Sequence, residues 1–155
     1  MESMLAALIA VAGTLLGVVV TNRQQNRRAD RSEKTAAAER LRQERVTACA
    51  DFARTVMEFR SSQYRRWRRR QSAYDSPSYE EARYESHQRR AEAWYALYRL
   101  RLVSGERQLV ELGNTAMTLA TRIDEANDLE ELKDIGSRTR IAVEEFIDAA
   151  SLRVV

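Results

Sequence analysis

The chain has 155 residues, of which 44% are hydrophobic and 32% charged, with one proline and five glycines. This composition is too apolar for a disordered chain and too poor in turn-forming residues for an all-β fold. The formal net charge of +3 at pH 7 excludes a polycation. One cysteine, Cys49, excludes an intramolecular disulfide, and with one histidine it argues against a His/Cys metal site, so we expect no metal and no cofactor.

The first predicted element is a transmembrane anchor at residues 1–21. The stretch Met4–Val20, "MLAALIAVAGTLLGVVV", carries no charge. As a helix it rises ~26 Å, close to the ~30 Å of a bilayer's hydrocarbon core. A cleaved signal peptide fits less well, because Glu2 is the only charge before the apolar run and no small-residue cleavage site follows it. A buried helix of a soluble protein remains an alternative.

Basic residues flank this anchor on one side only. No lysine or arginine precedes it, and four arginines follow it: Arg23, Arg27, Arg28 and Arg31. The positive-inside rule therefore predicts a single-pass protein of the plasma (inner) membrane, with its N-terminus outside and residues 22–155 in the cytoplasm. These juxtamembrane arginines also lie at the level of anionic lipid headgroups.

The anchor carries a stripe of small residues. Gly13 and Gly17 form a GxxxG motif, "GTLLG", and Ala6 and Ala10 lie on the same helical face. Small side chains let two helix backbones approach closely in lipid, where packing drives association. The stripe predicts a homo-oligomer; the alternative is a chance match, because glycine and alanine are common in membrane helices.

Residues 22–40 contain no apolar side chain larger than alanine. This composition predicts a polar juxtamembrane stalk, helical with frayed stretches, that separates the anchor from the rest of the chain.

From residue 41 the pattern predicts an antiparallel four-helix bundle over 41–155. The expected helices are about 41–72, 77–103, 106–126 and 129–153, with Ser76 as an N-cap and Pro77 in the first helical turn. The expected buried stripe of the first helix is Cys49, Phe52, Val56, Phe59, Gln63 and Trp67. That of the second is Tyr84, His87, Ala91, Trp94, Leu97 and Leu100. An alternative is that the first helix pairs with its copy in a parallel coiled coil.

The segment "YRRWRRR", residues 64–70, combines arginines with a tryptophan, as binding surfaces for anions do. On a helical wheel Trp67 joins the buried stripe, whereas Arg65, Arg68 and Arg69 lie on the far side. We expect glutamates early in the second helix to lie opposite three arginines of the segment: Glu80, Glu81 and Glu85 opposite Arg70, Arg69 and Arg66. The favoured interpretation of the segment is therefore a structural helix end. The second interpretation is that Arg65, Arg68 and Arg69 form a docking surface for an acidic protein; nucleic acid and anionic lipid are less favoured partners.

The overall plan resembles small membrane-anchored helical proteins of actinobacterial genomes, an uncharacterised group with no known activity. The resemblance rests on the anchor with "GTLLG", on "ERLRQERVTACADFARTVMEFRSSQYRRWRRR" and on "AEAWYALYRLRLV". It implies a high-GC bacterial source and a membrane location, and it transfers no catalytic residue.

No phosphate-binding loop, nucleophile elbow or HExxH motif is present. We expect a membrane-anchored, self-associating helical scaffold or adaptor that is not an enzyme and has no small-molecule substrate, with the lipid bilayer and a second copy as partners. One alternative is a membrane-active effector of the holin or pore type. Another is a soluble helical binder of protein or nucleic acid, whose N-terminal helix is buried in an oligomer.

Overall fold

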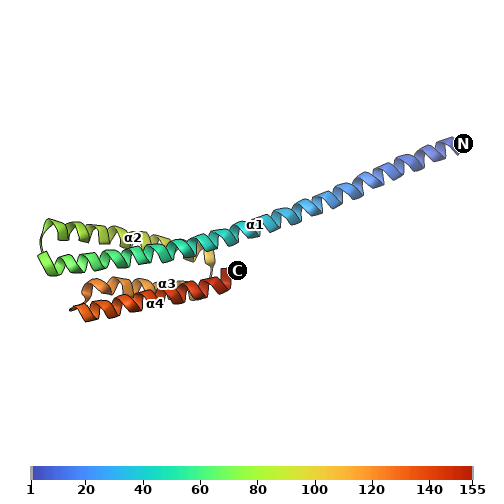
Figure 1. Cartoon of the computed structure of the whole chain (residues 1–155). Coiled ribbons are helices and arrows are strands. Elements are labelled where there is room, and N and C mark those ends of the chain that lie inside the picture. The colour runs from blue at the N-terminus through green and yellow to red at the C-terminus, as the bar shows by residue number, and fades with distance from the viewer. Residues whose placement is uncertain (1, 155) are drawn as a thin grey trace. The chain divides into compact units, whose positions relative to one another are not determined.

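The computed structural model describes the backbone of residues 2–154 and the side chains of residues 33–153. Over the described backbone the chain is all-α, without strands. The helices are α1 (Glu2–Ala73), α2 (Pro77–Ser104), α3 (Arg107–Arg122) and α4 (Leu129–Val154), and a 3-10 turn, η1 (Ile123–Glu125), follows α3 (Figure 1). The expected all-α fold with four helices is confirmed, although α3 ends earlier than the predicted residue 126.

The chain divides into two compact units, Met1–Arg40 and Leu41–Val155. The predicted anchor, its small-residue stripe (Ala6, Ala10, Gly13, Gly17) and the juxtamembrane arginines (Arg23, Arg27, Arg28, Arg31) lie outside the residues with described side chains, and they stay predictions. Among the residues whose side chains are described, no helix is long and apolar enough to cross a membrane.

Capping chemistry separates α1 from α2. The side chain of Ser76 accepts a hydrogen bond from the Tyr79 N–H at 3.2 Å, and Pro77 occupies the first helical position, where its missing N–H costs nothing. α2 ends at Gly105, whose φ of 63° lies in the left-handed region that glycine adopts without strain. The expected signals at Ser76 and Pro77 thus start α2 and turn the chain back along α1, and Gly105 ends α2.

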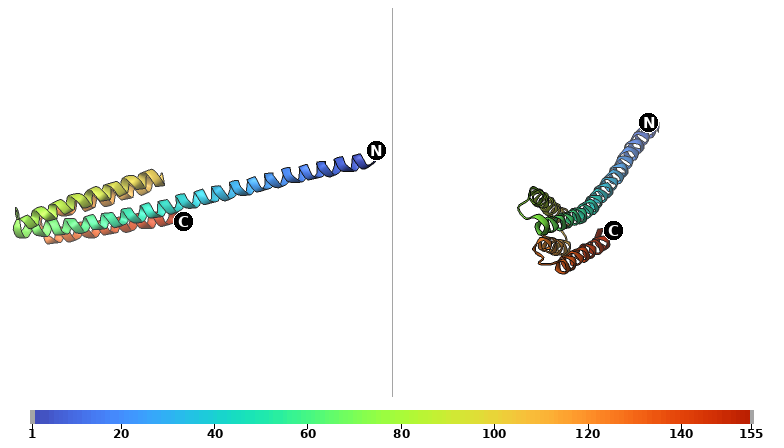
Figure 2. Two further views of the ribbon diagram at one scale, coloured as in Figure 1. Left: turned by 90° about the horizontal axis from the view of Figure 1, so that it is seen from above. Right: turned by 60° about the vertical axis from the view of Figure 1, so that its left-hand side comes forward.

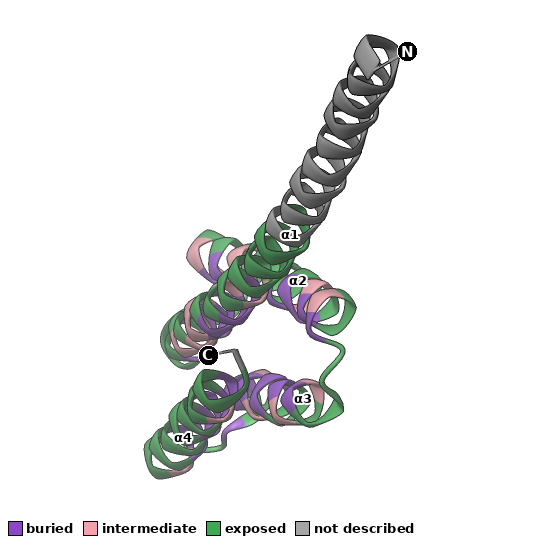
Figure 3. Cartoon of the chain, turned by 90° about the vertical axis from the view of Figure 1, so that its right-hand side faces the viewer, coloured by how far each residue is buried: buried purple, intermediate pink, exposed green. Residues whose placement is uncertain are grey.

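In the second unit, helices that follow one another along the chain run antiparallel (Figures 1 and 2). Arg45 of α1 donates to the carbonyl of Val103 near the end of α2, whereas Arg65 pairs with Glu85 near its start. α4 also runs against α1, because Tyr64 contacts Leu132 at the start of α4, whereas the earlier residue Phe52 packs edge-on against Phe146 further along it, with ring centroids 4.9 Å apart. The inner faces of these helices carry the buried residues (Figure 3).

The predicted stripe of α1 is buried throughout. Its members are Cys49, Phe52, Val56, Phe59, Gln63 and Trp67. All are covered by helices of the same chain, so this face is not available for a parallel coiled coil between two copies of α1. Close packing depends on Gly113 of α3, where an added Cβ would lie 2.7 Å from Leu97 and 3.2 Å from Phe52.

The predicted stripe of α2 is wrong in its first half. Tyr84, His87 and Ala91 are exposed. The buried residues of α2 are instead mostly small: Tyr79, Ala82, Ser86, Ala93, Ala96, Leu97, Leu100 and Ser104. Large rings from α1 fill the interior, so α2 approaches α1 largely through alanine and serine, and Tyr84, Tyr95 and Tyr98 face outward.

Candidate functional site

The strongest candidate in the sequence is the arginine segment, which we define as residues 60–70 of α1. Its side chains divide between those that face the bundle and those that face solvent. The inward set determines which arginines are left to bind a partner.

Trp67 holds the connection between α3 and α4. Its indole is 8% exposed, and its Nε1–H donates to the carbonyl of Ala126 at 2.8 Å. Arg70 donates to the same oxygen at 3.2 Å. Ala126 directly follows η1, and these two donors satisfy a carbonyl at a break between helices, where the regular helical pattern supplies no partner. The tryptophan of "YRRWRRR" is therefore a core residue with a capping role.

Arg66 forms an ion pair with Asp124 of η1 at 3.1 Å, where the two side chains are only 21% and 12% exposed. Within the described chain, Arg66 Nε and Asp124 Oδ1 are buried and make no hydrogen bond. Opposite charges attract one another more strongly where little water surrounds them, but removing each charge from water costs desolvation free energy. The pair therefore fixes the position of η1 and adds little net stability.

Gln63 links three helices from within the core. Its side chain is 3% exposed; its Nε2 donates to the carbonyl of Thr121 at 3.0 Å, and its Oε1 accepts from Ser86 Oγ at 2.5 Å. The sequence pattern placed Gln63 in an apolar stripe without assigning it partners. A buried amide requires such partners, and the last carbonyls of α3 are the groups that lack them.

Tyr64 and Arg60 bind α4. The Tyr64 hydroxyl donates to the carbonyl of Leu132 at 3.2 Å, and Arg60 Nε donates to that of Gly136 at 2.9 Å. The Arg60 guanidinium lies 5.0 Å from the centroid of the Tyr64 ring. A Cβ at Gly136 would collide with the Tyr64 hydroxyl, so glycine makes room for this contact.

The arginines differ from the expectation: among the described side chains, none of the three expected pairings with Glu80, Glu81 and Glu85 is formed. Arg65 was predicted to lie away from the glutamates, but its Nη2 pairs with Glu85 at 2.5 Å. Arg66, the expected partner of Glu85, turns to η1 instead, and Glu80 pairs with Arg83 within α2. α3 and η1, which a wheel of α1 alone does not include, determine this exchange.

Arg68 and Arg69 are exposed. Among residues 33–153, neither side chain forms an ion pair or a hydrogen bond with another residue of the chain. Of the three predicted docking residues, these two keep a free guanidinium, and their backbone carbonyls accept from Ser72.

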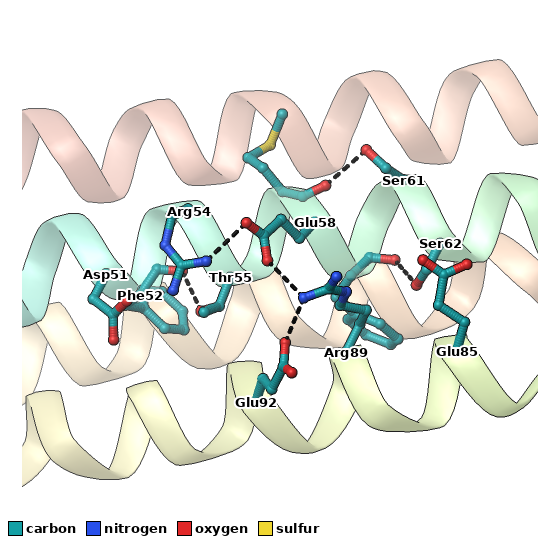
Figure 4. A network of polar contacts seen from close by, with 12 residues as sticks. Asp51, Phe52, Arg54, Thr55, Glu58, Ser61, Ser62, Glu85, Arg89 and Glu92 are labelled. Atoms are coloured by element: carbon teal, nitrogen blue, oxygen red, sulfur yellow. Dashed lines mark hydrogen bonds and ion pairs between the residues drawn. The ribbon is translucent and has the colours of Figure 1, made fainter.

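A second polar network ties α1 to α2 (Figure 4). Arg54 bridges Asp51 at 2.7 Å and Glu58 at 2.8 Å, and Glu58 also accepts from Arg89, which pairs with Glu92 at 2.9 Å. The hydrogen bond to Asp51 is the main cause that raises the pKa of Arg54, and the bond to Glu92 does the same for the pKa of Arg89. These exposed pairs set the register of the two helices more than they stabilise them.

An apolar groove of about 480 Å³ lies between α1 and α4. Val46 and Ala53 line it from α1, Ile147 and Ala150 from α4, and Cys49 also contributes. Burial raises the pKa of the Cys49 thiol above its ordinary value, which disfavours the reactive thiolate form. Within the described side chains, no three His, Cys, Asp or Glu residues lie close enough together to hold a metal ion.

Comparison with known families bears on this arrangement. The model of the KilB plasmid transfer protein family matches residues 46–154, from the bundle part of α1 to the end of α4. The chain belongs to the KilB plasmid transfer protein family. The match includes the whole arginine segment and every interhelix contact described above for Gln63, Trp67 and η1. No curated protein and no solved structure matches the chain.

Proposed function

We propose that this chain acts in plasmid transfer as a non-enzymatic scaffold or adaptor, held at the membrane by residues 4–20. The observation that carries the proposal is membership of the KilB plasmid transfer protein family over residues 46–154. Family membership supports a role in plasmid transfer. The proposed scaffold role is argued from the side-chain contacts of the bundle, and the proposed anchor from the sequence.

The scaffold role is supported by the use that the bundle makes of its polar groups. Gln63, Trp67 and Arg70 donate to backbone carbonyls where α3 and η1 end. Groups engaged in this way position helices. Arg68 and Arg69 are the exposed cationic pair that the arginine segment leaves for a partner. They would bind a protein surface rich in carboxylates, and we take them as the docking point of the adaptor.

The membrane role is supported by the uncharged stretch Met4–Val20 and the arginines that follow it. The small-residue stripe around Gly13 and Gly17 is the proposed contact between anchors. Together these features describe a self-associating protein of the plasma membrane, with its bundle in the cytoplasm.

A plasmid transfer assay tests the process. Donor cells that lack the gene should transfer plasmid at least tenfold less often than donors complemented with the intact chain; equal transfer frequencies would remove the proposal. In complemented donors the protein should stay with membranes through high-salt and alkaline washes, and recovery without detergent would favour the soluble alternative. Growth arrest with loss of membrane potential on expression would favour the pore-type alternative.

The docking point is tested in the same assay. Arg68→Glu with Arg69→Glu should lower transfer, whereas Arg122→Glu, at another exposed arginine, should not. All variants should melt within a few degrees of the intact chain. Equal transfer by the double variant and the control would exclude docking through this pair.

A further inference from the structure

α2 carries a line of exposed, mainly aromatic or apolar side chains on the face opposite its buried residues. We define the α2 stripe as Tyr84, Gln88, Ala91, Tyr95, Tyr98 and Leu102, all of them exposed. The four largest hydrophobic members are 66% (Tyr84), 71% (Tyr95), 56% (Tyr98) and 86% (Leu102) exposed. Successive members are four and three residues apart in alternation, which is the heptad spacing of a helix that pairs with another helix.

Single exposed apolar residues are ordinary on a protein surface and need no explanation. A line of them at heptad spacing differs, because one straight helix could cover the whole line. Tyrosine is also enriched where proteins bind one another, since it provides a large rigid contact area together with a polar end. Most of the buried residues of α2 are small, whereas four of its large side chains, Tyr84, Tyr95, Tyr98 and Leu102, are exposed.

We propose that the α2 stripe is the interface between two copies of this chain, with their α2 helices antiparallel. Centred on the stripe, this pairing places Tyr84 against Leu102 of the second copy. The next layers set Gln88 against Tyr98 and Ala91 against Tyr95, and a two-fold axis repeats all three. Every stripe member then meets another member, and the small Ala91 faces a large ring, as close packing requires.

Charges beside the stripe favour the antiparallel arrangement. Glu85, Glu92 and Arg99 lie along the same flank of the stripe, so antiparallel helices bring Glu85 near Arg99 of the second copy at both ends and leave one Glu92 pair at the two-fold axis. Parallel helices would instead set Glu81 against its own copy and Glu80 beside Glu85. Like charges so placed oppose pairing, whereas the opposite charges add specificity.

The area of the stripe suits a weak dimer. Aromatic side chains present ~150–250 Å² each when fully exposed, so the stripe offers roughly 500 Å² per chain. Two chains would bury about 1,000 Å² in all, near the lower limit for a specific interface. We therefore expect a dimer that forms at micromolar concentrations.

The proposal does not depend on the predicted anchor. Because Arg45 binds the carbonyl of Val103, the chain enters the bundle beside the C-terminal end of α2. In the antiparallel dimer the two entry points lie at opposite ends of the paired α2 helices, and the contact between the α2 helices uses no residue of the predicted anchor. Gly13→Leu with Gly17→Leu should therefore leave α2 pairing unchanged even if it abolishes contact between anchors.

Cysteine crosslinking of the full-length chain in detergent tests the orientation. All variants carry Cys49→Ala, which removes the native thiol. A mixture of Tyr84→Cys and Leu102→Cys chains should form a disulfide between the two variants on oxidation, and Tyr84→Cys alone should not. A crosslink with Tyr84→Cys alone, or none in the mixture, would overturn the antiparallel dimer.

Sedimentation of the same full-length protein tests the interface. Tyr95→Glu should raise the dimer dissociation constant at least tenfold. The matched control is Ile141→Glu, at a residue of α4 that is 46% exposed and lies outside the stripe; it should leave the constant unchanged. Tyr95→Ala with Tyr98→Ala repeats the test without a new charge, and circular dichroism verifies folding. A monomer at all concentrations, or equal dissociation constants for all variants, would refute the proposal.

Discussion

Replacement of Gln63 by methionine tests whether the buried amide holds α1, α2 and α3 together. Methionine has a similar length and shape, so it fills the site without a large cavity. It removes both the donor to the Thr121 carbonyl and the acceptor for Ser86 Oγ. The change therefore isolates hydrogen bonding from packing.

The expected cost follows from the two groups that lose their partner. A buried polar group left without a hydrogen bond costs ~1–3 kcal/mol. The Ser86 hydroxyl can turn to a carbonyl of its own helix, so the cost falls mainly on the Thr121 carbonyl, which is partly open to solvent. We expect the free energy of unfolding to fall by about 1–2 kcal/mol.

Urea unfolding followed by circular dichroism at 222 nm measures this difference. With a slope of ~2 kcal/mol per molar urea, the midpoint should fall by about 0.5–1 M. Gln71→Met is the control, because Gln71 is exposed on the same helix, and its midpoint should not move. Equal midpoints for the two variants would refute the view that the buried amide stabilises the bundle.

A double-mutant cycle with Ser86→Ala measures the contribution of the hydrogen bond between Ser86 of α2 and Gln63 of α1. Ser86→Ala alone leaves Gln63 Oε1 without its donor, whereas in the Gln63→Met background no such loss remains. The double variant should therefore be more stable than the sum of the single effects by at least ~0.5 kcal/mol. Strict additivity would show that the 2.5 Å contact carries no net energy.

Three further outcomes are expected. Gly136→Ala should destabilise the chain by ~1–3 kcal/mol, because the added methyl group collides with Tyr64. In a Tyr64→Ala background the same change should stabilise the chain by up to ~1 kcal/mol through helix propensity. Thermal melting measures both changes, and a stability change of the same sign in both backgrounds would contradict this explanation. Cys49 should react with an aromatic disulfide reagent much more slowly in the folded chain than in urea, and equal reaction rates would refute its burial. Because burial raises the pKa of Cys49, the free energy of unfolding should decline as pH rises past the ordinary pKa of a thiol. Glu58→Gln, which weakens two exposed ion pairs, should cost under ~1 kcal/mol in urea unfolding, and a larger loss would show that the network in Figure 4 stabilises the bundle.

The sequence alone determined the helices and the buried face of α1. Proline, glycine and capping residues act on the few residues beside them, so Ser76, Pro77 and Gly105 mark breaks that need no tertiary context. The stripe from Cys49 to Trp67 was predictable for a similar reason. Large apolar residues at helical spacing lie on one face of the helix, and that face is the one that is buried against the core.

Only the tertiary structure decided which face of α2 is buried and which arginines are free. The burial of α2 depends on the shape of α1: the rings of Phe52 and Phe59 leave room for alanine and serine, so Tyr84 and Tyr95 remain outside. Arg65 and Arg66 differ by one step along α1, yet one meets Glu85 of α2 and the other Asp124 of η1. A wheel of a single helix contains no neighbours, whereas the partner of a charge is set by whichever element packs beside it.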